Sequence, residues 1–209
     1  MIKKITLTDV VARLVAGGSQ RQIIAIAGAP GSGKSTVAEK LSELLNARQS
    51  GLASILPMDG FHYDDHLLTA LGRKDRKGAP DTFDVGGFYH TLLRMRARDE
   101  EAVAVPVFDR DLEISRGGAR LISRDIPIVI VEGNYLLLRD APWNSLKALF
   151  DLSVMVQCTD DTLRKRLTAR WAGYQLPEAE VRRRVDENDM PNGRLVREAS
   201  VAADFDLAN

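Results

Sequence analysis

The chain has 209 residues, of which 44% are hydrophobic and 28% are charged, as in an ordinary globular protein. Basic and acidic residues number 29 each, so no net charge attracts the protein to nucleic acid or to an anionic membrane. Its single cysteine, Cys158, cannot form an internal disulfide, and no Cys/His spacing typical of zinc occurs. We expect one domain over residues 1–209, in the cytoplasm, without nucleic-acid or membrane partners; nothing in the sequence supports a homo-oligomer.

The first 18 residues carry Asp9 and Arg13 within their apolar stretch, which is untypical of a signal peptide. No other apolar run approaches the length of about 20 residues that spans a bilayer. Residues 8–17 are typical of a helix that is capped by Thr8 and ended by glycine.

Short apolar runs bounded by turn residues recur along the chain, at 23–28, 52–58, 126–133 and 152–158. They are mostly continuous rather than alternating, as expected of strands covered on both faces. The tail, 201–209, is a candidate for a final strand.

Helical patterns separate these runs. The first has apolar residues at helical spacing, namely Val37, Ala38, Leu41, Leu44 and Leu45. The second, over 84–98, places Phe88, Leu92 and Met95 on one face and Asp84 at the N-cap. Residues 103–122 read instead as short strands and turns, which predicts an added hairpin. Strands that alternate with helices predict an α/β fold with a parallel sheet.

A glycine-rich motif follows the first run: Gly28, Ala29, Pro30, Gly31, Ser32, Gly33, Lys34 and Ser35. It satisfies G-x-x-x-x-G-K-[ST], lies after a predicted strand and opens a predicted helix, the setting of a phosphate-binding P-loop. Its backbone N–H groups and the helix N-terminus would bind phosphates. Lys34 would reach the β and γ phosphates, Ser35 would hold Mg²⁺, and Thr36 would assist.

Two acids stand at the ends of other predicted strands. Glu132 ends the run 126–133, where a carboxylate would lie beside the metal or its water. Asp59 follows the run 52–58, and the carboxyl ends of parallel strands face the ligand crevice. Asp59 could therefore take a proton from an attacking hydroxyl, although Asp-Gly is also an ordinary turn dipeptide.

Five motifs occur together in a characteristic order: the P-loop, DGFHY at 59–63, APDTFD at 79–84, VEG at 131–133 and a later arginine-rich helix. In this the chain resembles the phosphoribulokinase, uridine kinase and bacterial pantothenate kinase group of P-loop kinases, from about residue 23 to 189. Within the group it most resembles short proteins labelled as nucleoside kinase-like or as a fructose transport system kinase.

The resemblance implies a doubly wound parallel sheet of the P-loop NTPase type, with helices on both faces and a small lid. It implies ATP and Mg²⁺ as cofactors and a small-molecule hydroxyl acceptor, which could be a nucleoside, a pantothenate-like molecule or a sugar. Asp59 corresponds to the group's base and Glu132 to its metal-side acid. The segment 106–115 departs from the uridine kinase pattern and the chain is short for a pantothenate kinase, so the acceptor stays open.

The lid candidate is the arginine-rich segment 163–185. Arg166 and Arg170 stand four residues apart, on one face of a helix, and could neutralise charge on the transferring phosphate. They are preferred over Arg182, Arg183 and Arg184. A solvated basic helix is the plainer alternative.

Candidates for the acceptor pocket are Phe61, His62, Phe83 and Arg110, each of which could instead pack or cap locally. The basic loop 72–78, GRKDRKG, could order over an anionic acceptor or be a mobile surface loop.

Two other activities remain open from the sequence. One is a P-loop ATPase or GTPase switch, although no Asn/Thr-Lys-x-Asp segment for reading guanine is present. The other is a nucleoside monophosphate kinase, whose acceptor phosphate is already ionised and needs no base such as Asp59.

Overall fold

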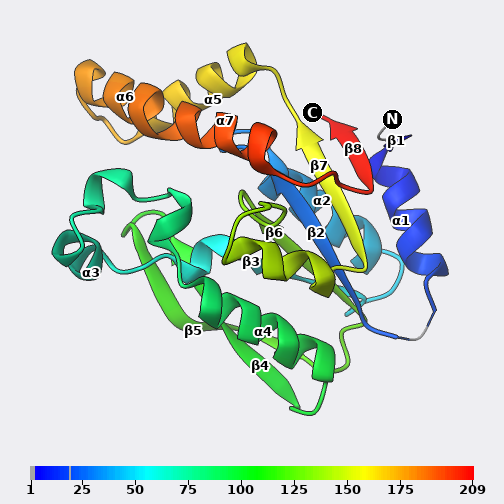
Figure 1. The fold of residues 1–209 in the computed structure, drawn as a ribbon. Coiled ribbons are helices and arrows are strands. Elements are labelled where there is room, and N and C mark those ends of the chain that lie inside the picture. The colour runs from blue at the N-terminus through cyan, green and yellow to red at the C-terminus, as the bar shows by residue number, and fades with distance from the viewer. Residues whose placement is uncertain (1–2, 19) are drawn as a thin grey trace.

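The computed structural model describes residues 3–18 and 20–209 (Figure 1). Its centre is a parallel six-stranded sheet in the order β1-β8-β7-β2-β6-β3. The strands are β1 (Lys3–Lys4), β2 (Gln22–Gly28), β3 (Ala53–Pro57), β6 (Ile128–Gly133), β7 (Leu152–Gln157) and β8 (Phe205–Ala208). All four predicted apolar runs are strands of this sheet, and the tail adds β8 between β1 and β7.

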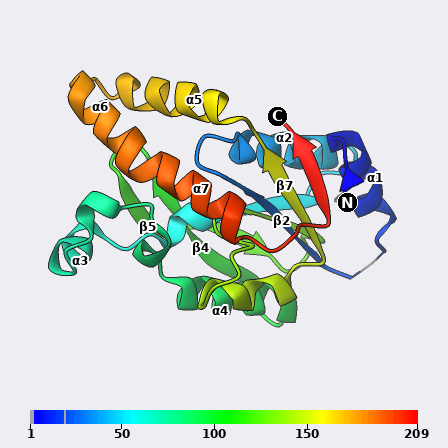
Figure 2. The same ribbon diagram turned by 45° about the horizontal axis from the view of Figure 1, so that its top comes forward.

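Both faces of the sheet are covered, which explains why the strand sequences are continuously apolar. In β2, Ile23 and Ala25 belong to a core that includes helix α4 (Val85–Ala97). Ile24 and Ile26 point to the opposite core, with α1 (Leu7–Ala16) and α2 (Lys34–Asn46). The predicted α/β fold with helices on both faces is confirmed (Figures 1 and 2).

One predicted helix start agrees with the structure and one differs, and one predicted core position of α2 also differs. The Asp84 side chain accepts a hydrogen bond from the Gly87 amide and caps α4, as predicted. The predicted cap Thr8 is wrong: Thr6 caps α1, because Asp9 stands three residues later and closes a reciprocal capping box. Leu44, predicted on the apolar face of α2, is exposed, because Leu41 and Leu45 already fill that face.

Residues 102–123 form a separate antiparallel hairpin of β4 (Ala102–Asp109) and β5 (Ile114–Ser123). A register irregularity lies between Val105 and Val107. Here the hairpin approaches the 3₁₀ turn 58–61 so closely that a Cβ on Gly60 would meet the Pro106 carbonyl oxygen at 2.4 Å. The hairpin therefore lies directly against the turn that follows β3.

The remaining helices lie around the carboxyl edge of the sheet. They are α3 (Asp65–Ala70), α5 (Asp160–Gly173), α6 (Glu178–Arg184) and α7 (Met190–Ala199), with a π-helical turn, Val185–Asp189, between α6 and α7. Figure 2 shows α6 and α7 as one helical rod that crosses the molecule. A small apolar cluster attaches this group to the phosphate loop through Ala29, Leu163 and Leu167. None of the helices in the described ranges is long and apolar enough to cross a membrane.

The strand order creates a switch point at β2. The chain runs from β2 to the edge strand β3, returns to β6 between them, and then continues to β7 on the other side of β2. In open α/β sheets, ligands bind at the carboxyl ends of strands where such a reversal occurs. The ends of β2, β6 and β3 are therefore the expected floor of the site.

Replacing Leu92 by alanine tests the core beneath α4. Leu92 is fully buried, whereas the next residue, Leu93, is 36% exposed. We expect Leu92→Ala to lower the free energy of unfolding by about 2 to 5 kcal/mol, because it leaves a cavity. Leu93→Ala is the matched control and should cost about 0.5 kcal/mol or less. Equal losses for the two variants in urea denaturation would contradict this assignment of the faces of α4.

Candidate active site

The glycine-rich motif forms the turn between β2 and α2. Gly31 and Gly33 have φ values of +77° and +88°, which L-residues rarely adopt. A Cβ on Gly28 would lie 2.5 Å from Ser32 Oγ, so the turn is also too tight for a side chain at its start. Loops of this kind turn successive amides inward and, with the N-terminus of a helix, form an anion site.

Lys34 is the first residue of α2 and is only 7% exposed. Burial lowers the pKa of its ammonium group, and the carboxylates of Glu132 and Asp59 act in the opposite direction. The lysine predicted to reach the phosphates is therefore close enough to both acids predicted from the strand ends for their charges to act on it.

Ser35 and Glu132 meet beside this lysine. Ser35 Oγ donates a 3.0 Å hydrogen bond to Glu132 Oε2. Glu132 is at the end of β6, next to β2, and is 6% exposed. Burial raises the pKa of Glu132, and Lys34 and the Ser35 hydrogen bond oppose that rise.

The oxygen atoms of Ser35 and Glu132 suit the binding of one hard cation. Nowhere in residues 3–18 and 20–209 do three or more His, Cys, Asp or Glu side chains gather as metal ligands. Mg²⁺ does not need such a cluster, since it commonly uses one or two protein oxygens together with phosphates and water. A hydroxyl and a carboxylate oxygen 3.0 Å apart at the mouth of a phosphate loop fit that coordination.

Asp59 lies in the 3₁₀ turn that follows β3. Arg110 of the hairpin donates a 2.5 Å hydrogen bond to Asp59 Oδ2. Nδ1 of His62 lies 2.7 Å from the Asp59 carbonyl oxygen. Burial by itself would raise the pKa of Asp59, but the positive charges of His62, Arg110 and Lys34 outweigh it and lower the pKa to about 2. The carboxylate is thus ionised at neutral pH.

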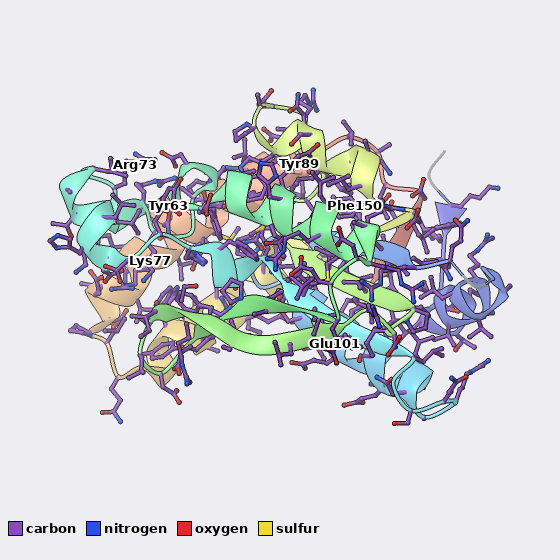
Figure 3. All side chains as sticks on the ribbon, turned by 90° about the horizontal axis from the view of Figure 1, so that it is seen from below. Tyr63, Arg73, Lys77, Tyr89, Glu101 and Phe150 are labelled. Carbon is purple, nitrogen blue, oxygen red and sulfur yellow. The ribbon has the colours of Figure 1, made fainter. Side chains whose placement is uncertain are left out.

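A cleft of 240 Å³ opens onto these residues. Its floor includes Lys34, Ser35 and Asp59. The walls come from segments far apart in the sequence: the turn 74–78, the hairpin loop and the α5–α7 region. These segments contribute Lys77, Phe108, Arg110, Glu113, Arg170, Trp171, Tyr174, Arg184, Asn188 and Asp189, among others. His62 and Asp65 add to the walls from the segment after β3, and Asn134 adds to them from the end of β6. Figure 3 shows Lys77 and Arg73 at the α3 end of the molecule, well away from Glu101 and Phe150.

The two arginines predicted for the lid occupy different places. Arg166 points to the outside of the phosphate loop, where its guanidinium donates to the Ser32 carbonyl oxygen at 3.1 Å. Arg170, one turn later on α5, lines the cleft itself. Arg183 and Arg184 also reach the cleft, but both are paired with Glu180. Thr36 is exposed in the first turn of α2.

The four predicted acceptor-pocket residues divide into two pairs. His62 and Arg110 line the cleft. Phe61 and Phe83 do not: they are 8% and 3% exposed and belong to the core. Phe61 packs against Phe88, and Phe83 packs edge-on against aromatic rings of the 135–143 segment. Their apolar rings face the sheet core because the hairpin and α4 cover them.

The basic loop 72–78 is ordered by contacts to three other segments. Lys77 forms a 2.6 Å ion pair with Asp65. The Gly78 carbonyl oxygen accepts from the Tyr135 hydroxyl at 2.5 Å, and the Lys77 carbonyl oxygen accepts from Asn188 at 2.8 Å. The loop thereby forms a fixed wall of the cleft.

Sequence reasoning missed several polar or aromatic residues of the cleft, among them Asn134, Trp171 and Asp189. Asn134 directly follows the VEG motif, which is a signal that could have identified it. Asp189 and Trp171 lie in helices whose sequences read as charged and solvated, and only packing shows that they turn inward.

Comparison with known proteins agrees with this geometry. A model of the phosphoribulokinase / uridine kinase family matches residues 23–170. The chain belongs to this family. A crystal structure from Silicibacter sp. TM1040, described as a "putative fructose transport system kinase", is 36% identical with a TM-score of 0.88, over 98% of this chain and 99% of that one.

Curated relatives of this family member carry different substrate names. A Schizosaccharomyces pombe protein named "Putative uridine kinase" is 33% identical over 90% of this chain and 83% of its own length. A Myxococcus xanthus pantothenate kinase is 30% identical over 76% of this chain, which spans only 53% of that enzyme. This family member is an ATP-dependent kinase.

Removing the Arg110 side chain tests the electrostatics of this kinase's cleft. Because Arg110 lowers the pKa of Asp59, Arg110→Ala should raise that pKa, since burial then acts against fewer positive charges. Carboxyl ¹³C NMR titration measures the shift directly. Arg116→Ala is the control, because Arg116 pairs with Asp109 on the same hairpin and should leave Asp59 unchanged. An unaltered Asp59 pKa in Arg110→Ala would exclude this ion pair as the cause.

Proposed function

We propose that the protein transfers the γ-phosphate of ATP to a hydroxyl group of a small molecule that binds in the 240 Å³ cleft. One observation carries this proposal: Asp59 and the buried Lys34 line the same cleft, and Ser35, the next residue of α2, donates a 3.0 Å hydrogen bond to Glu132. Lys34, Ser35 and Asp59 line this cleft, and Glu132 reaches it through its hydrogen bond with Ser35, so a phosphate site, a metal site and a base would lie next to one another.

The phosphate loop, residues 28–36, would hold the ATP phosphates through its main-chain amides. Lys34 would contact the β and γ phosphates, as the corresponding lysine does in other P-loops. Ser35 and Glu132 would hold Mg²⁺, which neutralises charge on the phosphates when it is bound. The protein would thereby hold ATP, the phosphoryl donor, in a fixed position before any acceptor enters.

Asp59 would act as the base. The acceptor oxygen forms a bond to the γ-phosphorus as the bond from that phosphorus to the β–γ bridging oxygen breaks. The bridging oxygen keeps the electron pair in ADP, and the hydroxyl proton passes to the Asp59 carboxylate. With a pKa of about 2, Asp59 is a weak base, which suits a loose transition state in which the proton leaves late.

Arg110 would set the timing of this proton transfer. It holds Asp59 Oδ2, while its own side chain is 48% exposed and therefore able to move. If the guanidinium turns to the incoming phosphate, the Asp59 carboxylate becomes more basic. Ion pairing would thus keep the base inactive until both substrates are present.

Arg166 and Arg170 would complete the phosphate site from a lid formed by residues 163–185 within one domain. Arg170 lines the cleft and would neutralise charge on the transferring group. Arg166, bonded to the Ser32 carbonyl oxygen, would position the loop instead of touching the phosphate.

The acceptor classes open to this site are nucleosides, pantothenate-like molecules and sugars. A release assay for ADP, with ATP and Mg²⁺, would be run without acceptor and then with each class and with nucleoside monophosphates. ADP that depends on a hydroxyl acceptor supports the proposal. Turnover without acceptor that a protein partner alters would favour a nucleotide switch, and turnover with monophosphates alone would favour a monophosphate kinase.

Substituting the base should slow chemistry without weakening ATP binding. We expect Asp59→Asn to lower kcat by about 10² to 10⁴, the usual contribution of a general base, with little change in ATP affinity. Asp99→Asn, an exposed aspartate in the turn before the hairpin, should keep normal turnover. An Asp59→Asn enzyme with normal kcat on its acceptor would exclude the base assignment.

Lys34→Ala should abolish phosphoryl transfer, because the ammonium group would contact the phosphates that carry the developing charge. Single-turnover measurements with saturating ATP separate this loss from weaker binding. If Lys34→Ala retained turnover within ten-fold of the wild type, the phosphate role of this lysine would be wrong.

Glu132→Gln should raise the Mg²⁺ concentration that gives half-maximal rate by roughly ten-fold or more, the scale seen when support for a metal site is lost. ADP affinity measured in EDTA should stay the same, since the carboxylate acts through the metal. Glu43→Gln is the control, because Glu43 lies on the exposed side of α2, the helix that carries Ser35. An unchanged Mg²⁺ dependence would reject Glu132 as a metal-side ligand.

A further inference from the structure

Two polar side chains of the cleft have no role in the phosphate chemistry. Asn134 is 9% exposed, and its amide oxygen is buried without a hydrogen-bond partner in the part of the chain that the structure describes. Asp189 is also 9% exposed. Both line the cleft that contains Lys34 and Asp59. A buried polar atom without a partner is costly, so Asn134 is a group that a bound ligand would satisfy.

The π-helical turn 185–189 gives Asp189 its inward position. A π turn adds a residue to a helix and changes which side chains face inward, and such turns are frequent at functional sites. The turn is fixed by Asn188, which donates to the Lys77 carbonyl oxygen at 2.8 Å. Asp189 Oδ2 accepts a 2.6 Å hydrogen bond from Trp171 Nε1, which leaves Oδ1 for a ligand.

The charges around this end of the cleft are already paired. Lys77 pairs with Asp65, and Arg110 pairs with Asp59. Arg183 and Arg184 pair with Glu180. In the described part of the chain no ion pair joins an acid to Lys34 or Arg170, and these two cations are the ones assigned to phosphate. Apart from Lys34 and Arg170, each lysine or arginine that lines the cleft in the described part of the chain already has a carboxylate within 4 Å, with Asp65 shared by Lys74 and Lys77 and Glu180 shared by Arg183 and Arg184. An anionic group of the acceptor would therefore have to compete with these carboxylates.

Acidic side chains at the same end of the cleft also disfavour an anionic acceptor. Asp189 and Glu113 both line the cleft, and burial raises the pKa of each. A carboxylate or a phosphate on the acceptor would have to be desolvated beside these groups without a partner. Hydroxyl groups, in contrast, would donate to Asp189 Oδ1 and to the Asn134 amide oxygen.

On the basis of the proposed kinase function, we propose that Asp189 and Asn134 bind the acceptor, and that the acceptor is a neutral molecule with several hydroxyl groups. Sugars and the ribose of nucleosides have this chemistry. One hydroxyl would lie at Asp59 for phosphorylation, and others would donate to Asp189 and Asn134. Acceptors that carry a carboxylate, such as pantothenate or glycerate, would be excluded.

Sites of this kind discriminate strongly. A site built to hydrogen-bond a substrate hydroxyl rejects an analogue that lacks it, because its buried polar groups are then left without partners. The Asp189 carboxylate and the Asn134 amide would therefore select among hydroxyl-bearing molecules by the number and position of their hydroxyls.

The test uses the full-length protein and measures ADP release with two acceptor panels. One panel holds neutral polyols, namely free sugars and ribonucleosides; the other holds pantothenate, glycerate and a sugar acid. We expect turnover with at least one member of the neutral panel and none with the carboxylates. If no compound of either panel stimulates ADP release, the proposed kinase function fails; if only carboxylates do, the kinase stands and the neutral-acceptor inference is overturned.

The variants locate the binding groups. With the acceptor found, Asp189→Asn should raise its KM by about ten-fold or more, as expected for loss of a hydrogen bond to a charged group, while KM for ATP changes less than about two-fold. Asp186→Asn is the matched control: Asp186 lies on the same π turn but pairs with Arg164, and both KM values should stay as in the wild type. An unchanged acceptor KM in Asp189→Asn would overturn the assignment.

A second variant and a second readout guard against simple misfolding. Asn134→Ala removes the amide without a change of charge and should raise the acceptor KM in the same direction. Thermal unfolding of both variants shows whether they fold. Because Trp171 donates to Asp189, binding of the acceptor alone should change tryptophan fluorescence in the wild type, and Asp189→Asn should shift this titration to higher concentration. A fluorescence titration that is the same in both proteins would contradict direct binding at Asp189.

Discussion

The burial of one charge, the ammonium group of Lys34, is the constraint on which the rest of the cleft depends. A buried charge without partners costs several kcal/mol or more, and burial does lower the pKa of this lysine. The carboxylates of Glu132 and Asp59 oppose that effect, and the phosphates of ATP would add to them. Lys34 and each of the two acids, Glu132 and Asp59, therefore favour one another's charged forms before any ligand arrives.

The parallel sheet is what brings these charges together. Because β6 lies between β2 and β3, the phosphate loop, Glu132 and the turn that carries Asp59 share one edge. The helix α2 adds its N-terminus to that edge, and the hairpin adds Arg110. A topology with β3 beside β2 would place Asp59 directly against the loop and leave no room for a metal-side acid between them. Strand order thus has a direct chemical consequence, beyond its role in covering the core.

Features of this arrangement that leave a local sequence pattern can be predicted from the sequence. Features that depend on how distant segments pack cannot. Buried strands and a P-loop impose local patterns, so β2, β6, Lys34 and Glu132 could be placed in advance. The N-cap of α1 could not, because Thr6 and Thr8 both suit the position and only Asp9 decides between them. Phe61 and Phe83 were misplaced because an aromatic residue next to a catalytic motif is equally able to pack in the core. Asp189 was missed because a π turn leaves no periodic signal.

The groups assigned to ATP and the residues that face the acceptor belong to different parts of the structure. This separation explains how relatives with different substrate names can share one fold. The groups assigned to ATP belong to the sheet edge and α2, where close packing tolerates little change. The walls that face the acceptor are attached to that edge by individual bonds from side chains to backbone, such as Tyr135 to Gly78 and Asn188 to Lys77. Residues on these walls can change without disturbing Lys34, Ser35 or Glu132. With the proposed function, acceptor choice would be a property of the wall segments, while phosphoryl transfer would be a property of the sheet edge.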